Sequence, residues 1–421
     1  MDVKKILFLT RNFPPMMTEG SARAWQLAAH FESEGWLPFV VGPAEVTGIE
    51  MPASLAGADF PVYYAGKPVE AGELDPGALS RVLHGRPVNR LTALKESVGG
   101  LFSADSSGKS WEKHAAELAR EVLAANPDIE VLYAQGPPSS PHQLGMELAN
   151  EHGLLMVLDY IEPYEFDAQY QRQEKIEDRT MLSGHVVIMP SRAMKVYMLK
   201  KHFGALSHDD ISIIRNGYDP GELSALAPYV GGDAVMRWVL LLERMTRKEL
   251  AGLFSAYSDL IAEHAELRGA LSLSIVGSQR DDAEEQLVKA GLHDLLDDRW
   301  YHSREDELDA CMQSDVCVIG VGSSAANAMF VPERFFDILG MRKPVFGVLA
   351  DGVARALVEE GGGDVVTPGE RSDMTAALSG LVQRWQNGTL GSMSDELALQ
   401  YQVPDALRQL RRDIVSRLLL G

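Results

Sequence analysis

The pattern that decides the fold lies in residues 1–42, MDVKKILFLTRNFPPMMTEGSARAWQLAAHFESEGWLPFVVG. Two short apolar runs, Ile6–Thr10 and Pro38–Gly42, flank the segment Ser21–Glu34. That segment carries four apolar residues on one face at helical spacing: Ala24, Leu27, Ala28 and Phe31. A buried strand, an amphipathic helix and a second buried strand make one βαβ unit, and such units build parallel sheets.

The same alternation continues along the chain. Further apolar runs in the first half are Val131–Ala134, Leu155–Asp159, Val186–Met189 and Ile211–Ile214. Those in the second half are Val239–Leu242, Leu271–Val276, Val316–Gly320, Pro344–Val348 and Asp364–Val366. Between the halves, residues 216–233 are polar and rich in Gly, as in an interdomain linker. A chain of 421 residues is too long for one core, so we expect two doubly wound α/β domains.

The charge balance excludes several classes of partner. The chain has 39 Lys and Arg against 60 Asp and Glu, a formal net charge of −21. Nucleic acid is excluded because affinity for a phosphate backbone comes largely from basic residues. The same acidity predicts that any membrane association is at most peripheral.

The apolar runs and the cysteines of the sequence indicate the compartment and the metal content to expect. No apolar run approaches the roughly 20 residues that span a bilayer. The start lacks the long apolar segment and the cleavage site of a signal peptide. The two cysteines, Cys311 and Cys317, do not have the spacing of a disulfide framework or a zinc site. We therefore expect a cytoplasmic protein with two buried, reduced thiols and no metal.

Two segments depart from the βα alternation. Residues 66–113 are long and irregular, which is typical of a functional lid or of surface packing. The tail Val403–Leu420 has the pattern of an amphipathic helix with several arginines. Such a helix can lie on a membrane. In so acidic a protein, packing onto the body of the protein is the better interpretation.

Two clusters in the sequence suit an anionic ligand. Gly20 precedes the first helix, where backbone amides can approach an anion, although it can equally relieve a turn. Arg244 and Lys248 follow a buried strand. A guanidinium fork and a point charge suit a diphosphate, and a solvated helix start explains them equally well.

A third cluster occupies the helix predicted after Pro332, which suits a first helical turn. Arg334 and Asp337 are three residues apart and therefore share a helical face. A carboxylate there can hold ribose hydroxyls while the arginine meets phosphate.

Taken in their order along the chain, these motifs resemble those of a GT-B-fold glycosyltransferase of the family-four type. Enzymes of that type are retaining and use nucleotide sugars. The resemblance covers nearly the whole chain. It rests on Pro14–Arg23, Gln135–His142, Leu158–Tyr164, Ile214–Asp219, Ser274–Ser278, Val331–Pro344 and Gly361–Gly369.

The resemblance implies two Rossmann-like doubly wound domains facing a central cleft. Residues 1–217 would bind the acceptor, residues 218–385 the nucleotide sugar, and residues 386–421 would be helices that pack back on the first domain. The implied reaction moves a sugar from a UDP- or GDP-sugar to the hydroxyl of a sugar or glycoconjugate acceptor, with retention. No other cofactor is implied. Glycan, polysaccharide or glycoconjugate biosynthesis is the implied context.

The resemblance also implies roles for donor-site residues. Arg244 and Lys248 would bind the diphosphate, with Gly20 and Arg334 near the same phosphates. The other two positions beside the nucleotide would be Gly277 and Ser278. Asp337 matches the ribose-binding carboxylate.

On the acceptor side, Asp159 and Glu162 would bind hydroxyls. His142 would contact acceptor or donor sugar, although packing of the following helix explains it too. A nearby aromatic group would stack on sugar or belong to the core: Tyr160, Tyr164, Phe166 and Tyr170. In enzymes of this type the departing diphosphate is thought to assist the acceptor hydroxyl, so catalysis is mainly positioning and charge stabilisation.

The sequence departs from the family pattern at specific positions. Glu19 and Glu243 stand where relatives have glycine, and Ile161 stands where close relatives have arginine. Met329 replaces the first of two glutamates. These departures leave two alternatives open: a non-catalytic GT-B protein that binds a protein partner, and a sugar-nucleotide epimerase.

Overall fold

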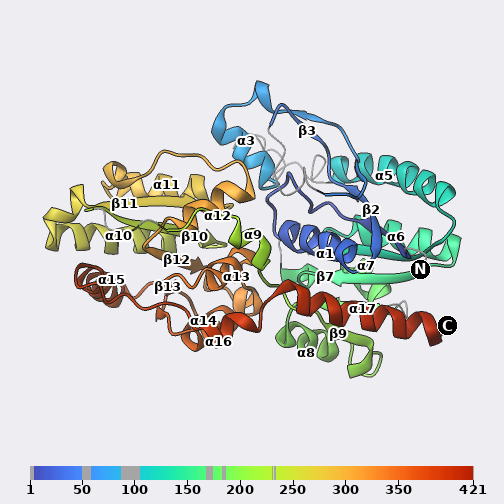
Figure 1. The fold of residues 1–421 in the computed structure, drawn as a ribbon. Helices are drawn as coiled ribbons and strands as arrows, with labels where there is room; N and C mark the ends of the chain where they lie inside the picture. The colour runs from blue at the N-terminus through green and yellow to red at the C-terminus, as the bar shows by residue number, and fades with distance from the viewer. Residues whose placement is uncertain are drawn as a thin grey trace. The chain divides into compact units, whose positions relative to one another are not determined.

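A computed structural model of the chain describes residues 4–49, 58–86, 105–166, 174–182, 186–229, 231 and 234–420. The chain divides into two compact units, each built on its own parallel sheet (Figure 1). The first unit comprises residues 1–217 and 403–421, and the second comprises residues 218–402.

The sheet of the first unit has seven strands in the order β4-β2-β1-β6-β7-β8-β9. The strands are β1 (Lys4–Leu9), β2 (Trp36–Gly42), β4 (Val62–Tyr64), β6 (Ile129–Gly136), β7 (Leu155–Tyr160), β8 (Val186–Met189) and β9 (Ile211–Ile213). All pairings in this sheet are parallel, and Ile6 of β1 lies between Pro38 of β2 and Val131 of β6. A small separate sheet pairs β3 (Val46–Thr47) with β5 (Val69–Glu70).

Helices cover both faces of this sheet. The helices of the unit are α1 (Ser21–Ser33), α3 (Pro76–Leu83), α5 (Asp105–Ala125), α6 (Ser140–His152), α7 (Glu174–Met181), α8 (Arg192–Lys201) and α17 (Val403–Leu420). Side chains alternate along a strand, so Val131 and Tyr133 of β6 join a core with α1 and α17. Leu132 and Ala134 face the other way, toward Gly145 of α6.

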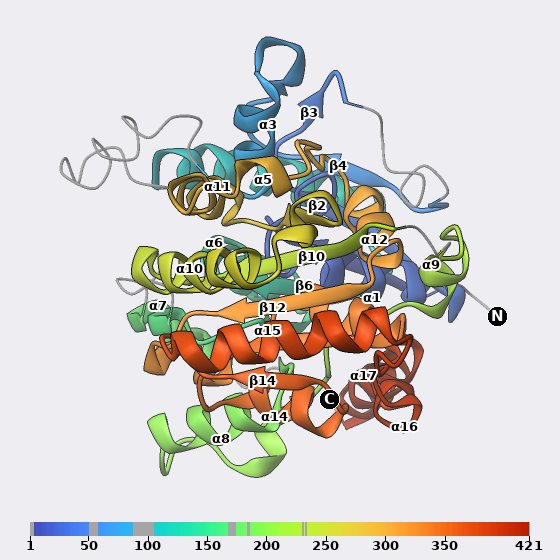
Figure 2. The same ribbon diagram turned by 90° about the vertical axis from the view of Figure 1, so that its left-hand side faces the viewer.

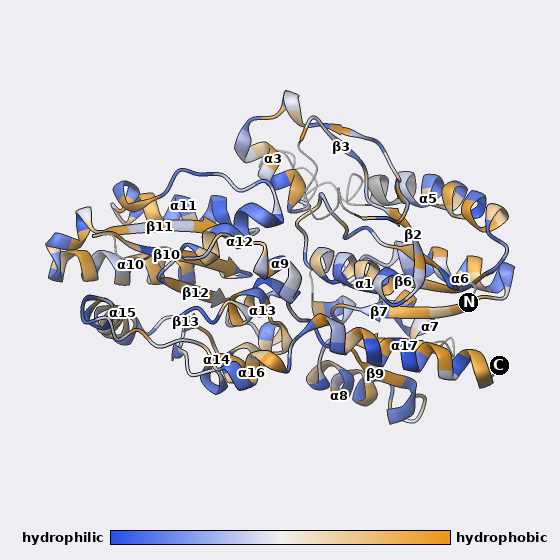
Figure 3. Ribbon diagram, viewed as in Figure 1, coloured by the Kyte–Doolittle hydropathy of each residue, from blue (hydrophilic) through white to orange (hydrophobic). Residues whose placement is uncertain are grey.

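The C-terminal helix α17 belongs to the first unit, and its packing against the body of the protein is confirmed. Leu407, Leu410 and Ile414 are buried in the same core as α1. Hydrophobic and hydrophilic residues alternate along the helix, with Leu419 exposed near its end (Figure 3). The apolar face of α17 is therefore largely buried in this core.

The sheet of the second unit has five parallel strands in the order β11-β10-β12-β13-β14. They are β10 (Met236–Glu243), β11 (Leu271–Val276), β12 (Val316–Val321), β13 (Val345–Val348) and β14 (Asp364–Val366). The helices are α9 (Pro220–Ser224), α10 (Arg247–Glu263), α11 (Arg280–Lys289), α12 (Arg304–Met312), α13 (Glu333–Gly340), α14 (Val353–Glu360), α15 (Arg371–Gln386) and α16 (Asp395–Leu399).

This second sheet is also covered on both faces. Trp238 and Leu240 of β10 pack with α10, α11 and α15 in one core. Val239 and Leu241 of the same strand pack with α12, α13 and α14 in another. Helices α10 and α15 lie against each other on their face of the sheet (Figure 2). Every apolar run quoted above is a strand, and both units are doubly wound.

Two expectations about irregular segments need correction. Residues 66–113 are not wholly irregular, because α3 and the start of α5 lie within them. Asp75 caps α3 by accepting the Ala78 amide at 2.8 Å, and the Trp111 indole of α5 donates to the Gly42 carbonyl at 2.7 Å. Residues 87–104, the centre of the expected lid, lie outside the described residues.

The polar stretch after residue 216 is likewise not only a linker. It contains α9, which Asp219 caps by accepting the Gly221 amide. Tyr218 is buried in the core of the second unit. The segment after residue 385 is divided, because α16 packs in the second unit and α17 in the first.

Candidate functional site

The strand order of the second unit defines where a ligand is expected. Numbered by their order along the chain, the five strands lie in the order 2-1-3-4-5. After β10 the chain forms β11 on one side of β10, and it then crosses over to form β12 on the other side. Ligands of such sheets bind outside the carboxyl ends of the strands, at the point where the order reverses. The residues at that edge are Glu243 at the end of β10, Gly277 and Ser278 after β11, and Gly322 and Ser323 after β12.

Carboxylates of the chain occupy the backbone amides at this edge. The Ser278 amide donates to Glu243 Oε1 at 3.1 Å, and the Ser278 hydroxyl donates to Glu243 Oε2 at 2.5 Å. The neighbouring Gly277 amide donates to Glu307 Oε1 at 3.1 Å. After β12, the Ser323 amide donates to Glu249 Oε1 at 2.8 Å. The contacts of Glu249 and Glu307 could not be predicted from the sequence, because both residues lie in charged helical segments that resemble solvated surface.

Glycines are required where these loops meet. Gly277 has a φ of +85°, and a Cβ there would lie 2.7 Å from Glu243 Oε1. A Cβ on Gly322 would lie 1.9 Å from the Arg244 carbonyl oxygen. The loops after β10, β11 and β12 therefore approach one another too closely for any side chain at these two positions.

The predicted diphosphate cations lie beside this edge. Arg244 has a φ of +56°, which is unusual for a residue with a side chain, and its guanidinium lies 3.8 Å from the centroid of the Phe330 ring. Lys248 is in the first turn of α10, exposed, with no hydrogen bond or ion pair to any described residue. Both cations thus follow β10 directly, as the sequence indicated.

Arg334 and Asp337 are held by other partners within the unit. Arg334 Nε donates to Glu307 Oε2 at 2.7 Å. Asp337 accepts two hydrogen bonds from Arg304, at 2.9 and 2.7 Å, and Arg304 also pairs with Glu222 at 3.0 Å. Burial raises the pKa of Asp337, while the Arg304 charge acts to lower it. Both residues lie on α13, and both are already engaged in ion pairs.

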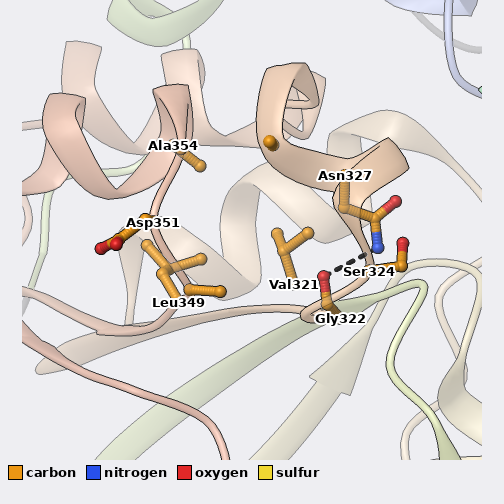
Figure 4. Close-up of a pocket in the computed structure, with 10 residues that line it drawn as sticks. Val321, Gly322, Ser324, Asn327, Leu349, Asp351 and Ala354 are labelled. Carbon is orange, nitrogen blue, oxygen red and sulfur yellow. Dashed lines mark hydrogen bonds between the residues drawn. The ribbon is translucent and has the colours of Figure 1, made fainter.

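A small recess lies beside the carboxyl ends of β12 and β13 (Figure 4). Its volume is about 20 Å³, enough for about one water molecule. Asn327 lines it and donates to the Gly322 carbonyl at 2.8 Å. The recess is too small to hold a nucleotide.

The first unit places Gly20 where its own strand order reverses, between β1 and β6. Gly20 has a φ of +89°, and a Cβ there would lie 3.0 Å from the Ile161 side chain. Gln135 donates to the Gly20 carbonyl at 3.0 Å and accepts from the Thr10 hydroxyl at 2.9 Å. Asn12 donates to the Pro137 carbonyl at 3.1 Å. Buried polar side chains therefore tie these two strand ends together.

Asp159 is fully buried in an ion pair. Its oxygens accept from Arg23 Nε at 2.7 Å and Arg23 Nη2 at 3.0 Å, and the Tyr133 hydroxyl also donates to it. Arg23 Nη1 also donates a hydrogen bond to the Ile214 carbonyl at 2.8 Å. The Asp159 carboxylate therefore ties β7 to Arg23 of α1, and Arg23 in turn ties α1 to the residue after β9. The carboxylate itself is fully buried. Glu162, two residues beyond β7, is also buried.

His142 has protein partners at both ring nitrogens. Nε2 lies 3.1 Å from the Ala134 carbonyl and 3.2 Å from the Asp159 carbonyl, so it donates. Nδ1 lies 2.7 Å from the Tyr164 hydroxyl and accepts from it. Burial lowers the pKa of His142 to about 4, which keeps the ring neutral. This is the geometry of the packing interpretation, and contact with a sugar stays a prediction.

Two members of the aromatic group near β7 belong to the core, which favours the core interpretation over sugar stacking for Tyr160 and Tyr164. Tyr160 and Tyr164 are buried around His142, with ring centroids 4.5 and 6.0 Å from it. Phe166 packs on Tyr197 at 4.9 Å. Tyr170 lies outside the described residues.

The described residues show neither a metal site nor a membrane-spanning helix. Among the described residues, no group of three or more His, Cys, Asp or Glu side chains is arranged to hold a metal ion. Both cysteines are free and buried. In the part of the chain that the structure describes, no helix is long and apolar enough to cross a membrane.

The chain has the GT-B fold, as its architecture and its likeness to solved structures show. Sucrose-phosphate synthase from Thermosynechococcus elongatus matches with a TM-score of 0.65 at 14% identity, over 99% of this chain and 100% of that one. HepE from Anabaena, in complex with UDP-glucose, matches at 0.61 and 16% identity, over 98% and 99% of the two chains. A proposed UDP-N-acetylglucosamine 2-epimerase from Listeria monocytogenes matches at 0.58 and 12% identity, over 99% and 98%. No protein-family model matches the sequence, and no curated protein sequence matches it.

Proposed function

We propose that the protein is a glycosyltransferase that moves a sugar from a UDP- or GDP-sugar to an acceptor hydroxyl with retention. The observation that carries the proposal is the pair Arg244 and Lys248, which follow β10 at the switch point of a GT-B second unit. Solved structures of this fold include complexes with UDP and with UDP-glucose. An acceptor from glycan, polysaccharide or glycoconjugate synthesis fits this reaction class.

On this proposal, residues 218–385 bind the nucleotide sugar. Arg244 and Lys248 neutralise the diphosphate, and Gly277 and Ser278 lie beside the nucleotide. Asp337, on the buried side of α13, meets the ribose while Arg304 holds its carboxylate in place. Arg334 contributes positive charge from the same helix.

We propose that the acceptor binds the first unit, with different roles for the three candidate residues there. Glu162 follows β7 and is the residue we propose for contact with acceptor hydroxyls. Asp159 and His142 are 0% exposed, against 6% for Glu162, so we propose that they act by positioning that loop. Because the departing diphosphate takes the acceptor proton in a reaction of this type, catalysis depends on positioning and charge stabilisation.

Binding of a nucleotide is the first test. Purified protein is titrated calorimetrically with UDP, GDP, ADP, TDP and CMP, and its thermal unfolding is followed with each. A ligand that binds only the folded state stabilises it by about 2.7 kcal/mol at a hundredfold excess over its dissociation constant. We expect one base to stand out, with UDP or GDP the strongest. A folded protein that binds none of the five contradicts the proposal.

One observation favours the alternative of a non-catalytic protein that binds a partner. Three carboxylates already satisfy strand-end amides of the second unit: Glu243, Glu249 and Glu307. The epimerase alternative has support only from the fold. Product analysis separates the three, because a transferase releases nucleoside diphosphate, an epimerase changes only the sugar, and a binding protein changes neither.

A further inference from the structure

The carboxylate of Glu243 makes the contacts that an anionic ligand would make at the end of β11. It accepts from both the amide and the hydroxyl of Ser278, at 3.1 and 2.5 Å. Backbone amides that follow a parallel strand, before a helix begins, attract phosphate and carboxylate groups. Here α11 begins at Arg280, two residues after Ser278. The anion in this position belongs to the protein itself.

The position of Glu243 is fixed by its surroundings. It is the last residue of β10, its side chain is 6% exposed, and its own carbonyl accepts the Gly322 amide at 3.1 Å. The φ of +85° at Gly277 and the close approach of Glu243 Oε1 leave no room for a side chain between the two loops. The carboxylate is therefore built into the loop contacts, and it is not a freely moving surface charge.

A second carboxylate reinforces the arrangement. Glu307 is 1% exposed, accepts the Gly277 amide at 3.1 Å and pairs with Arg334 at 2.7 Å. Two consecutive amides, Gly277 and Ser278, thus each face a negative charge. A phosphate that approached these amides would be repelled by the two carboxylates. It would also have to break the hydrogen bonds that the carboxylates already make.

We propose that Glu243 is an internal competitor for the diphosphate of the nucleotide, and so a residue that sets how strongly the site selects phosphate. This inference rests on the proposed function, because it concerns the same nucleotide site. To bind at Ser278, the diphosphate must displace the Glu243 carboxylate, while Arg244 and Lys248 remain to attract it. Affinity for a nucleoside diphosphate is therefore lower than these cations alone would give.

The experiment measures the dissociation constants of UDP and GDP by calorimetry for four proteins. These are the wild type, Glu243→Ala, Glu243→Gln and the control Glu285→Gln. Glu285 lies on α11, where it pairs with Arg247 and Lys289, so its loss removes one negative charge from the same unit. We expect Glu243→Ala to bind at least one of the two nucleotides tenfold or more tightly than wild type. We expect the control to stay within about threefold.

The glutamine variant guards against misfolding of the alanine variant. It is neutral and nearly isosteric, and its amide oxygen can still accept from Ser278, so we expect a gain of about threefold. Thermal unfolding of each variant shows that it is folded. If the wild type binds a nucleotide and both Glu243 variants bind it equally or more weakly, this inference is overturned and the proposed function stands. If all four folded proteins bind neither nucleotide, both the inference and the proposed donor site are wrong.

Discussion

At the scale of single residues, the buried pair of Arg23 and Asp159 is the clearest structural determinant in the first unit. The side chains are 3% and 0% exposed, and removal of one partner leaves the other charge buried and uncompensated. We predict that Asp159→Asn lowers the free energy of unfolding by about 3–5 kcal/mol, measured by chemical denaturation. The control Asp128→Asn breaks an exposed pair with Lys5 and should leave the unfolding midpoint unchanged. An equal response of the two variants would contradict this assignment.

His142 predicts a specific dependence of stability on pH. Its pKa in the folded protein is lowered from 6.5 to about 4 by burial, so between these values the unfolded chain binds a proton that the folded protein does not. Stability is therefore full above pH 6.5 and falls as the pH drops toward 4. We predict that His142→Gln removes about 3 kcal/mol of this fall, measured as unfolding free energy from pH 4 to 7. The exposed His208→Gln serves as the control, and an unchanged pH profile in His142→Gln would contradict the burial argument.

At the scale of elements, α17 supplies part of the core of the first unit. Leu410 is fully buried against α1, whereas Leu419 on the same helix is 81% exposed. We predict that Leu410→Ala lowers the free energy of unfolding by about 2–5 kcal/mol because it leaves a cavity. Leu419→Ala should have no such effect, and denaturation of the two variants under identical conditions checks this. Equal behaviour would mean that α17 does not pack on the unit in solution.

The elements that the sequence predicted well are those whose signal is local. Val316–Gly320 is a continuous apolar run, because a central strand covered on both faces is buried throughout. Helix α3 was not predicted, because its start, Pro76-Gly77, looks like a turn in sequence although Asp75 caps a helix there. Helix α9 was not predicted for the same reason, because it begins with Pro220-Gly221.

The candidate site was predictable only where its residues follow one another in the chain. Arg244 and Lys248 were found because they come directly after a strand. Glu249 and Glu307 were not, because their contacts with Ser323 and Gly277 join residues 74 and 30 positions apart in the sequence. For the same reason the sequence did not reveal that Asp159, a carboxylate at a strand end, pairs with Arg23, which lies 136 residues away.

At the scale of the whole molecule, the two units share a design but differ in their strand-end chemistry. In the first unit the ends of β1 and β6 are joined by neutral side chains such as Gln135 and Asn12. In the second they are joined by carboxylates, with cations beside them. The molecule as a whole carries a net charge of −21, so a polyanionic nucleotide needs local positive charge to bind. On this account Arg244 and Lys248 supply it.

The measurement that tests this claim most directly is the affinity of UDP and GDP for the double variant Arg244→Ala/Lys248→Ala. Its matched control is Arg268→Ala/Lys289→Ala, which removes two cations from the surface of the same unit. We predict that the first variant binds the preferred nucleotide at least a hundredfold more weakly than wild type, because each charged hydrogen bond contributes about 1.5–3 kcal/mol. The control should stay within about threefold. A double variant that is folded and keeps wild-type affinity would show that the nucleotide does not bind at the end of β10.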